Sequence, residues 1–458
     1  MLEHAYFDNA ATTWPKPECV HGFADRFYRS HGVNPGRSGS LLAAEAAEMI
    51  ELTRRQLAAC VGYHGNPARV VFTFNGTDAL NMAINGSVND GDHIVATRLE
   101  HNAVRRVLHH LERDRGISVT YVSASDDGRV APDHIEAALR PDTTLIVFTH
   151  ASNVTGLVQP LAEIAQVARA RGVRLVVDAA QTAGVSKIDL AQLEGVSALA
   201  MPSHKGLLGP MGAGVLVVAE HVELVPLRVG GTGTESVSRF QPEDYPHRLE
   251  AGTLPLPAIA GLHAAQAWLA ELGGRIEGAE GVVTEGAVTG SGQLGRPVVD
   301  QAWQVADTAE WRLIEPSLPL SLPDFDAAVH ARRTRRAIEA IHTRELALLA
   351  RIEARLRQSP AVRLIGVDTN DRLVDGAVEN GRVATLSFVV DGMLTSMLAD
   401  MLDADHHVIA RAGLHCAPMV HEDAGIDLEE GAIRLSPGAF TSEAEIEQLL
   451  DAFDAILP

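Results

Sequence analysis

Short apolar runs alternate with helical patterns between about residues 68 and 220 of this chain. The runs do not alternate between apolar and polar positions, which is typical of strands that are buried on both faces of a sheet. Several stretches between them have helical spacing, as in residues 161–170. The pattern predicts an α/β fold with a mostly parallel sheet. The predicted strands are residues 69–74, 93–97, 144–149, 174–177, 198–201 and 214–218.

The C-terminal part has a different pattern. Residues 331–356 carry an apolar stripe at helical spacing, and residues 384–390 predict a strand. A helix is expected near residues 395–402, and a last helix begins at Ser442. These elements predict a smaller α+β domain.

Residues 276–328 differ in composition from the predicted helices and strands on either side of them. Residues 281–295 are rich in Gly, Ser, Thr and Val, and closely spaced prolines follow. We therefore expect an insertion or a long loop between helices. Trp303 and Trp311 lie inside it, which predicts that the segment is docked on the protein.

Composition narrows the class of protein. The 458 residues include 38 basic and 59 acidic ones, for a net charge of −21, which argues against a nucleic-acid or anionic-membrane binder. No apolar run approaches 18 residues, and the N-terminus lacks the pattern of a signal peptide, so we expect a cytoplasmic protein. Cys19, Cys60 and Cys416 are too few and too scattered for a disulfide framework or a zinc site, and no metal is expected.

Polar residues follow five of the predicted strands. In a parallel sheet, ligands bind outside the carboxyl ends of the strands. The sequence therefore predicts a ligand site at this edge. The polar segments are Asn75-Gly76-Thr77, Glu100-His101-Asn102, His150-Ala151-Ser152-Asn153, Asp178-Ala179-Ala180-Gln181 and Ser203-His204-Lys205.

Asp178 and Lys205 suit one chemistry in particular. A lysine can form a Schiff base with pyridoxal phosphate, and a carboxylate can keep the pyridine nitrogen protonated. The other strand ends could supply the rest of such a site. Gly76 and Thr77 begin a helix whose free N–H groups could bind an anion, although an ordinary N-cap would look the same.

The remaining candidates are ambiguous when taken singly. His101 could lie flat on a cofactor ring, and Asn153 and Gln181 could reach its phenolate-like oxygen. Ser203 and His204 could complete a phosphate site. Each of these residues is more often structural, so the prediction depends on their joint order along the sheet.

Six segments together resemble the cysteine desulfurases of the class V aminotransferase fold, in the short-loop group that includes selenocysteine lyases. The resemblance covers residues 6–272 and 330–455. The segments are residues 6–13, 100–102, 150–156, 177–181, 203–206 and 411–416. The resemblance implies the type I fold of pyridoxal-phosphate-dependent transferases. It further implies a large domain with a seven-stranded sheet over residues 15–265, and a small domain from residues 1–14 and 266–458.

The resemblance also implies roles around the cofactor ring. Lys205 would be the Schiff-base lysine and would move the Cα proton. Asp178 would pair with the pyridine nitrogen, and Gln181 would bind the ring oxygen. His101 would stack on the ring, and Asn153 would lie beside the ring and the substrate.

The phosphate would be held by Thr77, Ser203 and His204. Thr232, in Gly231-Thr232-Gly233, matches a loop that reaches the phosphate of the neighbouring subunit, which implies a homodimer.

The reaction itself would depend on the C-terminal part. Arg434 would bind the substrate carboxylate in bidentate fashion, with Arg411 as a second candidate. Cys416 would attack the sulfur of L-cysteine, leaving a persulfide and releasing alanine. Arg411 and His415 could favour the thiolate form of Cys416.

Two departures from the family pattern matter. Residues 417–421 lack the long serine-rich loop of the other desulfurase group, which implies a separate sulfur-acceptor protein. The insertion has no counterpart in the family. Three alternatives stay open: a selenocysteine lyase; an aminotransferase, epimerase or carbon–sulfur lyase in which Cys416 is incidental; and a non-catalytic relic.

Overall fold

The structure is a computed structural model that describes residues 4–35, 39–286, 308–316, 318, 325–366 and 381–457. Its centre is a seven-stranded sheet in the order β2-β8-β7-β6-β5-β3-β4. All neighbouring strands are parallel except β8, which is antiparallel to β2 and β7. The predicted mostly parallel sheet is confirmed. Its strands are β2 (Val70–Thr73), β3 (His93–Thr97), β4 (Ser118–Val122), β5 (Thr143–Thr149), β6 (Arg174–Asp178), β7 (Ala198–Pro202) and β8 (Gly214–Val218).

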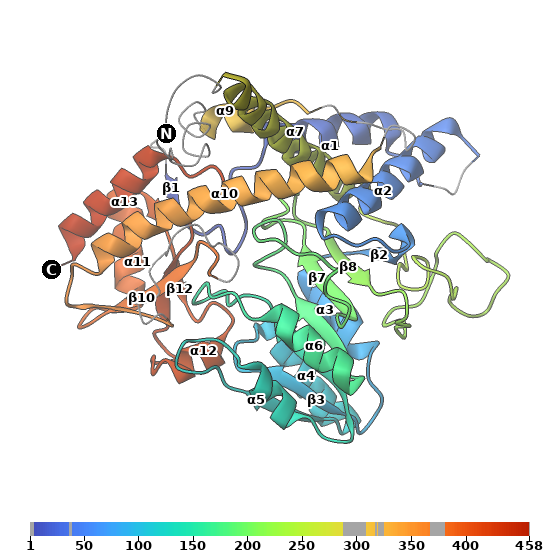
Figure 1. Ribbon diagram of the computed structural model, residues 1–458, viewed down its shortest axis with the longest axis horizontal. Coiled ribbons are helices and arrows are strands. Elements are labelled where there is room, and N and C mark those ends of the chain that lie inside the picture. The colour runs from blue at the N-terminus through green and yellow to red at the C-terminus, as the bar shows by residue number, and fades with distance from the viewer. Residues whose placement is uncertain are drawn as a thin grey trace.

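Helices cover both faces of this sheet (Figure 1). Leu175 and Val177 of β6 pack on one side and Val176 on the other, so the strand is apolar throughout. One face packs against α3 (Gly76–Asn85) and α4 (Asn102–Arg115). The remaining helices of this part are α1 (Glu18–His31), α2 (Leu41–Cys60), the 3-10 turn η1 (Pro67–Arg69), α5 (Pro132–Ala138), α6 (Leu161–Arg171), α7 (Leu256–Gly286) and α9 (Thr308–Arg312).

One strand of the seven-stranded sheet, β4, was absent from the sequence prediction. β4 is the edge strand beside β3, and only its last residue, Val122, is buried. Ser118 and Thr120 break the apolar run that marks the other strands. An edge strand can therefore form without the signal that identifies central strands.

The smaller domain contains an antiparallel sheet in the order β12-β13-β10-β9. A parallel pair of β1 (Ala5–Tyr6) and β11 (Val408–Ile409) joins the N-terminal segment to it. The last helix begins after Ser442, whose side chain forms a capping box with Glu445. The elements are β9 (Val362–Leu364), β10 (Leu386–Val390), α11 (Thr395–His406), β12 (Arg411–Gly413), α12 (Pro418–Asp423), β13 (Ala432–Leu435) and α13 (Glu443–Ile456).

The long helix α10 (Ala327–Leu356) connects the two parts and crosses most of the molecule in Figure 1. Its Ile341 packs in the core of the large sheet, whereas Ile352 packs in the core of the small domain. The predicted domain division at residue 265 stays a prediction, and packing of the large core continues past it to Trp268.

The expectation of a loop is wrong for residues 276–286, because α7 continues as one helix to Gly286. Trp311 is 6% exposed, and its carbonyl oxygen accepts a hydrogen bond of 2.8 Å from Trp268 Nε1. The prediction of a docked segment is confirmed at this residue. Trp303 lies outside the described residues.

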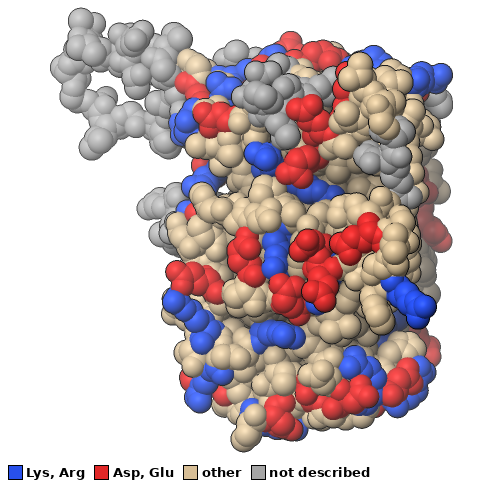
Figure 2. Space-filling model, turned by 90° about the vertical axis from the view of Figure 1, so that its right-hand side faces the viewer, with Lys and Arg blue, Asp and Glu red and all other residues tan. Residues whose placement is uncertain are grey.

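On the face shown in Figure 2, Lys and Arg side chains are interspersed with Asp and Glu side chains. Within the described part of the chain, no helix is long and apolar enough to cross a membrane. The same residues contain no group of three or more His, Cys, Asp or Glu side chains placed to hold a metal ion.

Candidate active site

Asp178 and Lys205 lie close together at the carboxyl ends of two neighbouring parallel strands. Asp178 ends β6, and Lys205 follows β7 on the next loop. Burial raises the pKa of Asp178, while its N–H partner Ala180 (2.9 Å) and Lys205 oppose this. Burial lowers the pKa of Lys205 to about 8, although the Asp178 charge partly offsets the effect. The structure thus brings the predicted pair together in a buried site.

His101 and Asn153 come from the next two strand ends. His101 caps α4, and its Nδ1 accepts a hydrogen bond of 3.0 Å from Ala103 N, which assigns the ring proton to Nε2. Burial, with the positive charges of Lys205 and Arg434, lowers the pKa of His101 to about 4. The imidazole is therefore neutral at pH 7.

Glu100 was named only as a strand-end residue, without a role. It is fully buried, and its Oε1 accepts hydrogen bonds from Thr97 Oγ1 (2.7 Å) and Thr149 N (3.0 Å). Its Oε2 has no partner. Burial raises the pKa of Glu100 to about 8, and the nearby Asp178 charge adds to this. A carboxyl that is protonated at neutral pH therefore lies beside Asp178.

The predicted anion site lies at the start of α3. Asn75 caps the helix by accepting from Asp78 N at 2.9 Å, while Thr77 is exposed in the first turn. A Cβ added to Gly76 would lie 3.4 Å from Pro202 Cβ, so this helix start adjoins the segment that carries Ser203. The free N–H groups of the first turn favour an anion here.

Ser203 and His204 differ in whether their polar side-chain atoms are free to bind a ligand. Ser203 Oγ donates to Pro210 O at 2.8 Å, so its hydroxyl proton is already used. His204 Nδ1 is buried without a partner, and burial with the charges of Lys205 and Lys16 lowers the pKa of His204 to about 4. The unpartnered ring nitrogen of His204 is available to a ligand.

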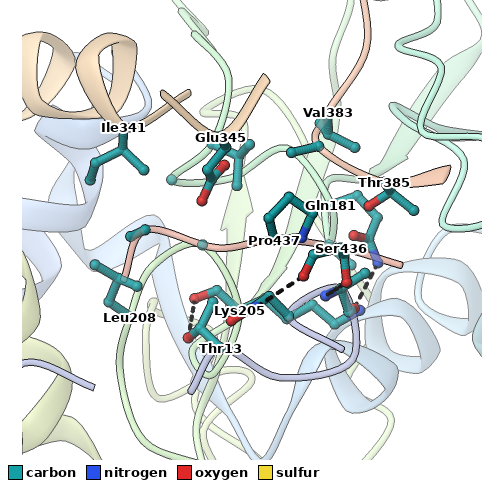
Figure 3. A pocket seen from close by; sticks show the side chains of 18 residues that line it. Thr13, Gln181, Lys205, Leu208, Ile341, Glu345, Val383, Thr385, Ser436 and Pro437 are labelled. Carbon is teal, nitrogen blue, oxygen red and sulfur yellow. Dashed lines mark hydrogen bonds between the residues drawn. The ribbon is translucent and has the colours of Figure 1, made fainter. Parts of the chain in front are cut away.

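Gln181 is buried and donates from Nε2 to Ala10 O at 3.1 Å. It lines a small cavity of about 40 Å³ with Lys205 and Thr13. Glu345 points into this cavity from α10, on the side opposite Thr13 and Lys205 (Figure 3). The N-terminal segment and α10 therefore contribute to the site, which sequence reasoning did not predict.

Arg434 lies on β13 and is 3% exposed. Its Nη1 donates to Asn153 O at 3.2 Å, and its Nη2 pairs with Asp8. Its Nε is buried without a partner. Burial lowers the pKa of Arg434 and the Asp8 carboxylate opposes this. A bidentate bond to a substrate carboxylate would have to displace Asp8, a competitor that the sequence did not reveal.

Arg411 is exposed and lies opposite Arg434 in the β12–β13 pair. Because directly paired residues of antiparallel strands share a face of the sheet, the two guanidinium groups place positive charge on one side. The predicted roles of Arg434 and Arg411 in binding a substrate carboxylate stay predictions.

Cys416 follows β12 on a tightly held loop. His415 and Cys416 have φ values of +51° and +58°, a left-handed conformation that is strained for side chains other than glycine. Asn102 N donates to Cys416 O at 2.7 Å, and Asn153 Nδ2 donates to His415 O at 2.7 Å. The thiol is exposed. The large domain therefore holds the backbone of a strained loop that presents a free thiol.

Cys416 lines a cavity of about 400 Å³ together with His101 and Thr77. Its charge also acts on Lys205. Residues from three distant parts of the chain thus line one cavity.

The expectation that His415 favours the thiolate is wrong. His415 is buried, and burial together with the charges of Arg434 and His421 lowers its pKa to about 2. A neutral imidazole supplies no positive charge to a neighbouring sulfur. Of the two residues expected to favour the thiolate of Cys416, only Arg411 can supply a positive charge.

Thr232 is not brought to Lys205 within this chain. Its Oγ1 makes hydrogen bonds only with Thr234, at 3.2 and 3.3 Å. The segment between β8 and α7 projects from the body of the molecule at the right of Figure 1. The predicted role of Thr232 at the phosphate of a neighbouring subunit stays a prediction.

These groups fit pyridoxal phosphate. A buried carboxylate, a neutralisable buried lysine, a helix start and an imidazole with an orphaned nitrogen are complementary to a cationic pyridine, an aldehyde and a phosphate. Asp178, Lys205, Thr77 and His204 are the residues that would hold it.

Comparison with known proteins agrees with this site. The profile of the family described as "Aminotransferase class-V" matches residues 5–282 and 325–449. A probable cysteine desulfurase of Methanothermobacter thermautotrophicus is 34% identical over 279 residues, which cover 60% of this chain and 68% of that protein. Cysteine desulfurase IscS of Klebsiella pneumoniae is 34% identical over 264 residues, covering 56% of this chain and 61%, under two thirds, of IscS.

Solved structures give the same result. The apo structure of a cysteine desulfurase from Thermococcus onnurineus NA1 has a TM-score of 0.76 and 25% identity, covering 99% of this chain and 94% of that one. The cysteine desulfurase CsdA from Escherichia coli has a TM-score of 0.72 at 23% identity and shows the fold alone.

The chain belongs to the class-V aminotransferase family, and the predicted type I fold is confirmed. Within that family, these relatives are cysteine desulfurases, which confirms the resemblance found in the sequence. The family profile leaves residues 283–324 unmatched, close to the insertion expected at residues 276–328.

Proposed function

We propose that this protein is a pyridoxal-phosphate-dependent cysteine desulfurase, which converts L-cysteine to L-alanine and keeps the sulfur as a persulfide on Cys416. The position of Cys416 supports this best. Its exposed thiol lines the same cavity as His101 and is within electrostatic reach of Lys205. A buried structural cysteine would have neither property.

Bound pyridoxal phosphate supplies an electron sink that makes the Cα proton of an amino acid removable. Because burial lowers the pKa of Lys205 to about 8, a sizeable fraction of this amine is neutral near pH 7.5 and able to accept that proton. His101, neutral with its proton on Nε2, can donate a hydrogen bond from that atom.

The carboxylate of the substrate would bind the cationic side of the site. Arg434 is buried and has an unpartnered Nε, and the exposed Arg411 lies opposite it across the strand pair. Exchange of Asp8 for the substrate carboxylate would preserve the charge balance of Arg434.

Cys416 carries out the group transfer. The thiolate Sγ attacks the sulfur of the substrate, and an S–S bond forms as the Cβ–S bond breaks. The electron pair of the broken bond goes to Cβ, which then takes a proton and becomes the methyl group of alanine. The loop geometry keeps the thiol exposed for this attack.

The decisive experiment measures alanine and sulfide formed from L-cysteine in the presence of a thiol reductant. The wild type should yield both in equal amounts, and Cys416→Ala should lose both, since no other exposed thiol lies in the site. Cys60→Ala is the matched control and should retain full activity. Equal activity of Cys416→Ala and the wild type would disprove the persulfide role.

The same variants separate the rival reactions. If Cys416→Ala loses sulfide release but still releases selenide from L-selenocysteine, the desulfurase mechanism is supported. A wild type that acts on L-selenocysteine and leaves L-cysteine unchanged is a selenocysteine lyase. A wild type that consumes neither substrate but transfers amino groups is an aminotransferase.

The assembly is also part of the proposal. Val229, Val237 and Phe240 are 73%, 99% and 84% exposed on the projecting segment that carries Thr232, which suits burial against a second copy. A homodimer would bring the partner subunit's Thr232 to the phosphate. A separate sulfur-acceptor protein and a cytoplasmic location stay predictions.

A further inference from the structure

The loop that carries Lys205 is held by an N-terminal segment. The carbonyl oxygen of His204 accepts hydrogen bonds from Lys16 Nζ (2.7 Å), Thr12 Oγ1 (3.1 Å) and Thr13 N (3.0 Å). Thr13 Oγ1 donates to Lys205 O at 3.1 Å, the contact visible in Figure 3. These donors converge on the peptide that immediately precedes Lys205.

Lys16 is unusual among these donors. It is 8% exposed, and among the described residues its amine hydrogen-bonds to Thr13 Oγ1 and His204 O. No described carboxylate forms an ion pair with it. A buried ammonium without a counter-ion costs several kcal/mol. A neutral side chain would fill the same space without that cost. The presence of an amine at position 16 therefore needs an explanation.

We propose that Lys16 is a positioning residue for Lys205. Its hydrogen bond to His204 O fixes the path of the loop, so that the Lys205 amine and the His204 ring project toward the cofactor site. While the amine is charged, below its pKa of about 7, this bond is stronger than one between neutral groups. The inference rests on the proposed function, in which Lys205 binds the cofactor.

The surroundings of Lys16 support this role. The titratable groups of the loop that faces it are His204 and Lys205, both cationic when protonated. The Lys16 charge helps to lower the pKa of His204 to about 4, which keeps His204 neutral at pH 7. Burial lowers the pKa of Lys16 itself to about 7.

Stability distinguishes positioning from a structural tether. The folded pKa of Lys16 lies below its unfolded value, so its contribution to stability increases as pH rises from about 7 toward 10 and is least favourable below 7. Thr12 and Thr13 would still hold the segment without Lys16. Lys16→Met should therefore be at least as stable as the wild type at pH 6, whereas loss of a tether would destabilise the protein.

The chain contains only three lysines, and the third, Lys187, is exposed. Lys187→Met is thus a matched control. With L-cysteine as substrate, Lys16→Met should lower kcat roughly ten- to a hundred-fold, because misplacement of a reacting group has effects of this size. KM should change by less than about two-fold, since the residue touches no substrate. Lys187→Met should match the wild type.

Two further readouts keep the proposal testable. Apo Lys16→Met should form its visible cofactor absorbance more slowly on addition of pyridoxal phosphate than apo wild type. Lys16→Arg, which keeps the charge and donors, should recover part of the rate. If Lys16→Met does not fold, Lys16→Gln replaces it, with a loss between those of Met and Arg.

The two levels of proposal fail differently. A wild type without cofactor absorbance or sulfide release overturns the proposed function. An active wild type, with Lys16→Met unchanged in kcat and in the rate of absorbance formation, overturns the role of Lys16 alone. The role of Lys16 is also overturned if Lys16→Met is less stable than the wild type at pH 6 and if Lys16→Met and Lys16→Arg lose the same fraction of kcat.

Discussion

At the scale of single residues, burial decides which side chains can react. Burial raises the pKa values of Cys19 and Cys60 to about 12, so both thiols stay protonated at physiological pH. Cys416 is exposed on a loop with left-handed backbone. The three cysteines are thus chemically different, although their spacing in the sequence gives no sign of it.

We expect iodoacetamide at pH 7.5 to modify Cys416 alone, because the thiolate is the reactive form and the other two thiols hold their protons. Peptide mass spectrometry after limited labelling would locate the adduct. Prior incubation with L-cysteine without a reductant should move the label to the outer sulfur of the proposed persulfide, so that a thiol reductant then removes it from Cys416. Labelling of Cys60 at a comparable rate would contradict this account.

Sequence reasoning found residues whose role follows from chain order. Asp178 and Lys205 were identifiable because each directly follows a recognisable strand. The Asp8–Arg434 pair was not, because 426 positions separate its members. The expectation that His415 favours the thiolate of Cys416 was also wrong. Burial keeps this imidazole neutral, and a local sequence motif does not show burial.

At the scale of elements, α10 places a buried acidic side chain in the cavity next to Lys205. Glu345 is 7% exposed and lines the cavity that Lys205 also lines. Burial raises the pKa of Glu345 to about 8. Because the folded pKa exceeds the unfolded value, folded protein binds more protons between about pH 4.5 and 8, and stability falls as pH rises through that window.

Glu345→Gln should therefore raise the midpoint of thermal unfolding more at pH 8 than at pH 5. Each kcal/mol gained should add roughly 1 °C for a chain of 458 residues. Differential scanning calorimetry at the two pH values would measure the gain. Glu339→Gln, on an exposed position of the same helix, is the control and should show no such pH dependence. An equal shift at both pH values would mean that Glu345 is ionised throughout.

Prediction of whole elements depended on how regular their pattern is. The strands at 93–97 and 214–218 were predicted with their observed bounds because an unbroken apolar run fills the centre of each. β4 was missed because an edge strand tolerates polar residues. The end of α7 was misplaced because Gly281 and Gly286 indicated a loop where the helix continues.

At the scale of the whole molecule, the site forms where two domains meet. Cys416 and Arg434 come from the smaller domain, Lys205 and His101 from the large one. Asn102 N and Asn153 Nδ2 bond the Cys416 loop from the large domain, and Arg98 pairs with α12 behind it. Relative placement of the domains therefore fixes the distance between the nucleophile and the lysine, and no local sequence pattern encodes it.

The projecting segment with Thr232 leads to a prediction for the assembled protein. If Thr232 acts in the neighbouring subunit, Thr232→Glu should place a carboxylate against the phosphate in both sites of a homodimer and abolish activity. Lys205→Ala should abolish it independently. In a heterodimer of the two variants, one site contains an intact Lys205 and the intact Thr232 of the other subunit.

Mixing the two inactive variants under conditions of subunit exchange should therefore restore about a quarter of wild-type activity. About half of the dimers would be heterodimers, each with one working site of two. Sulfide release would measure the recovery, and light scattering would verify the dimer. The matched control mixes Lys205→Ala with Cys416→Ala, which leaves no intact site because both residues serve their own subunit. Absence of recovery in an exchanging dimer would show that Thr232 acts within its own chain, or not at the phosphate at all.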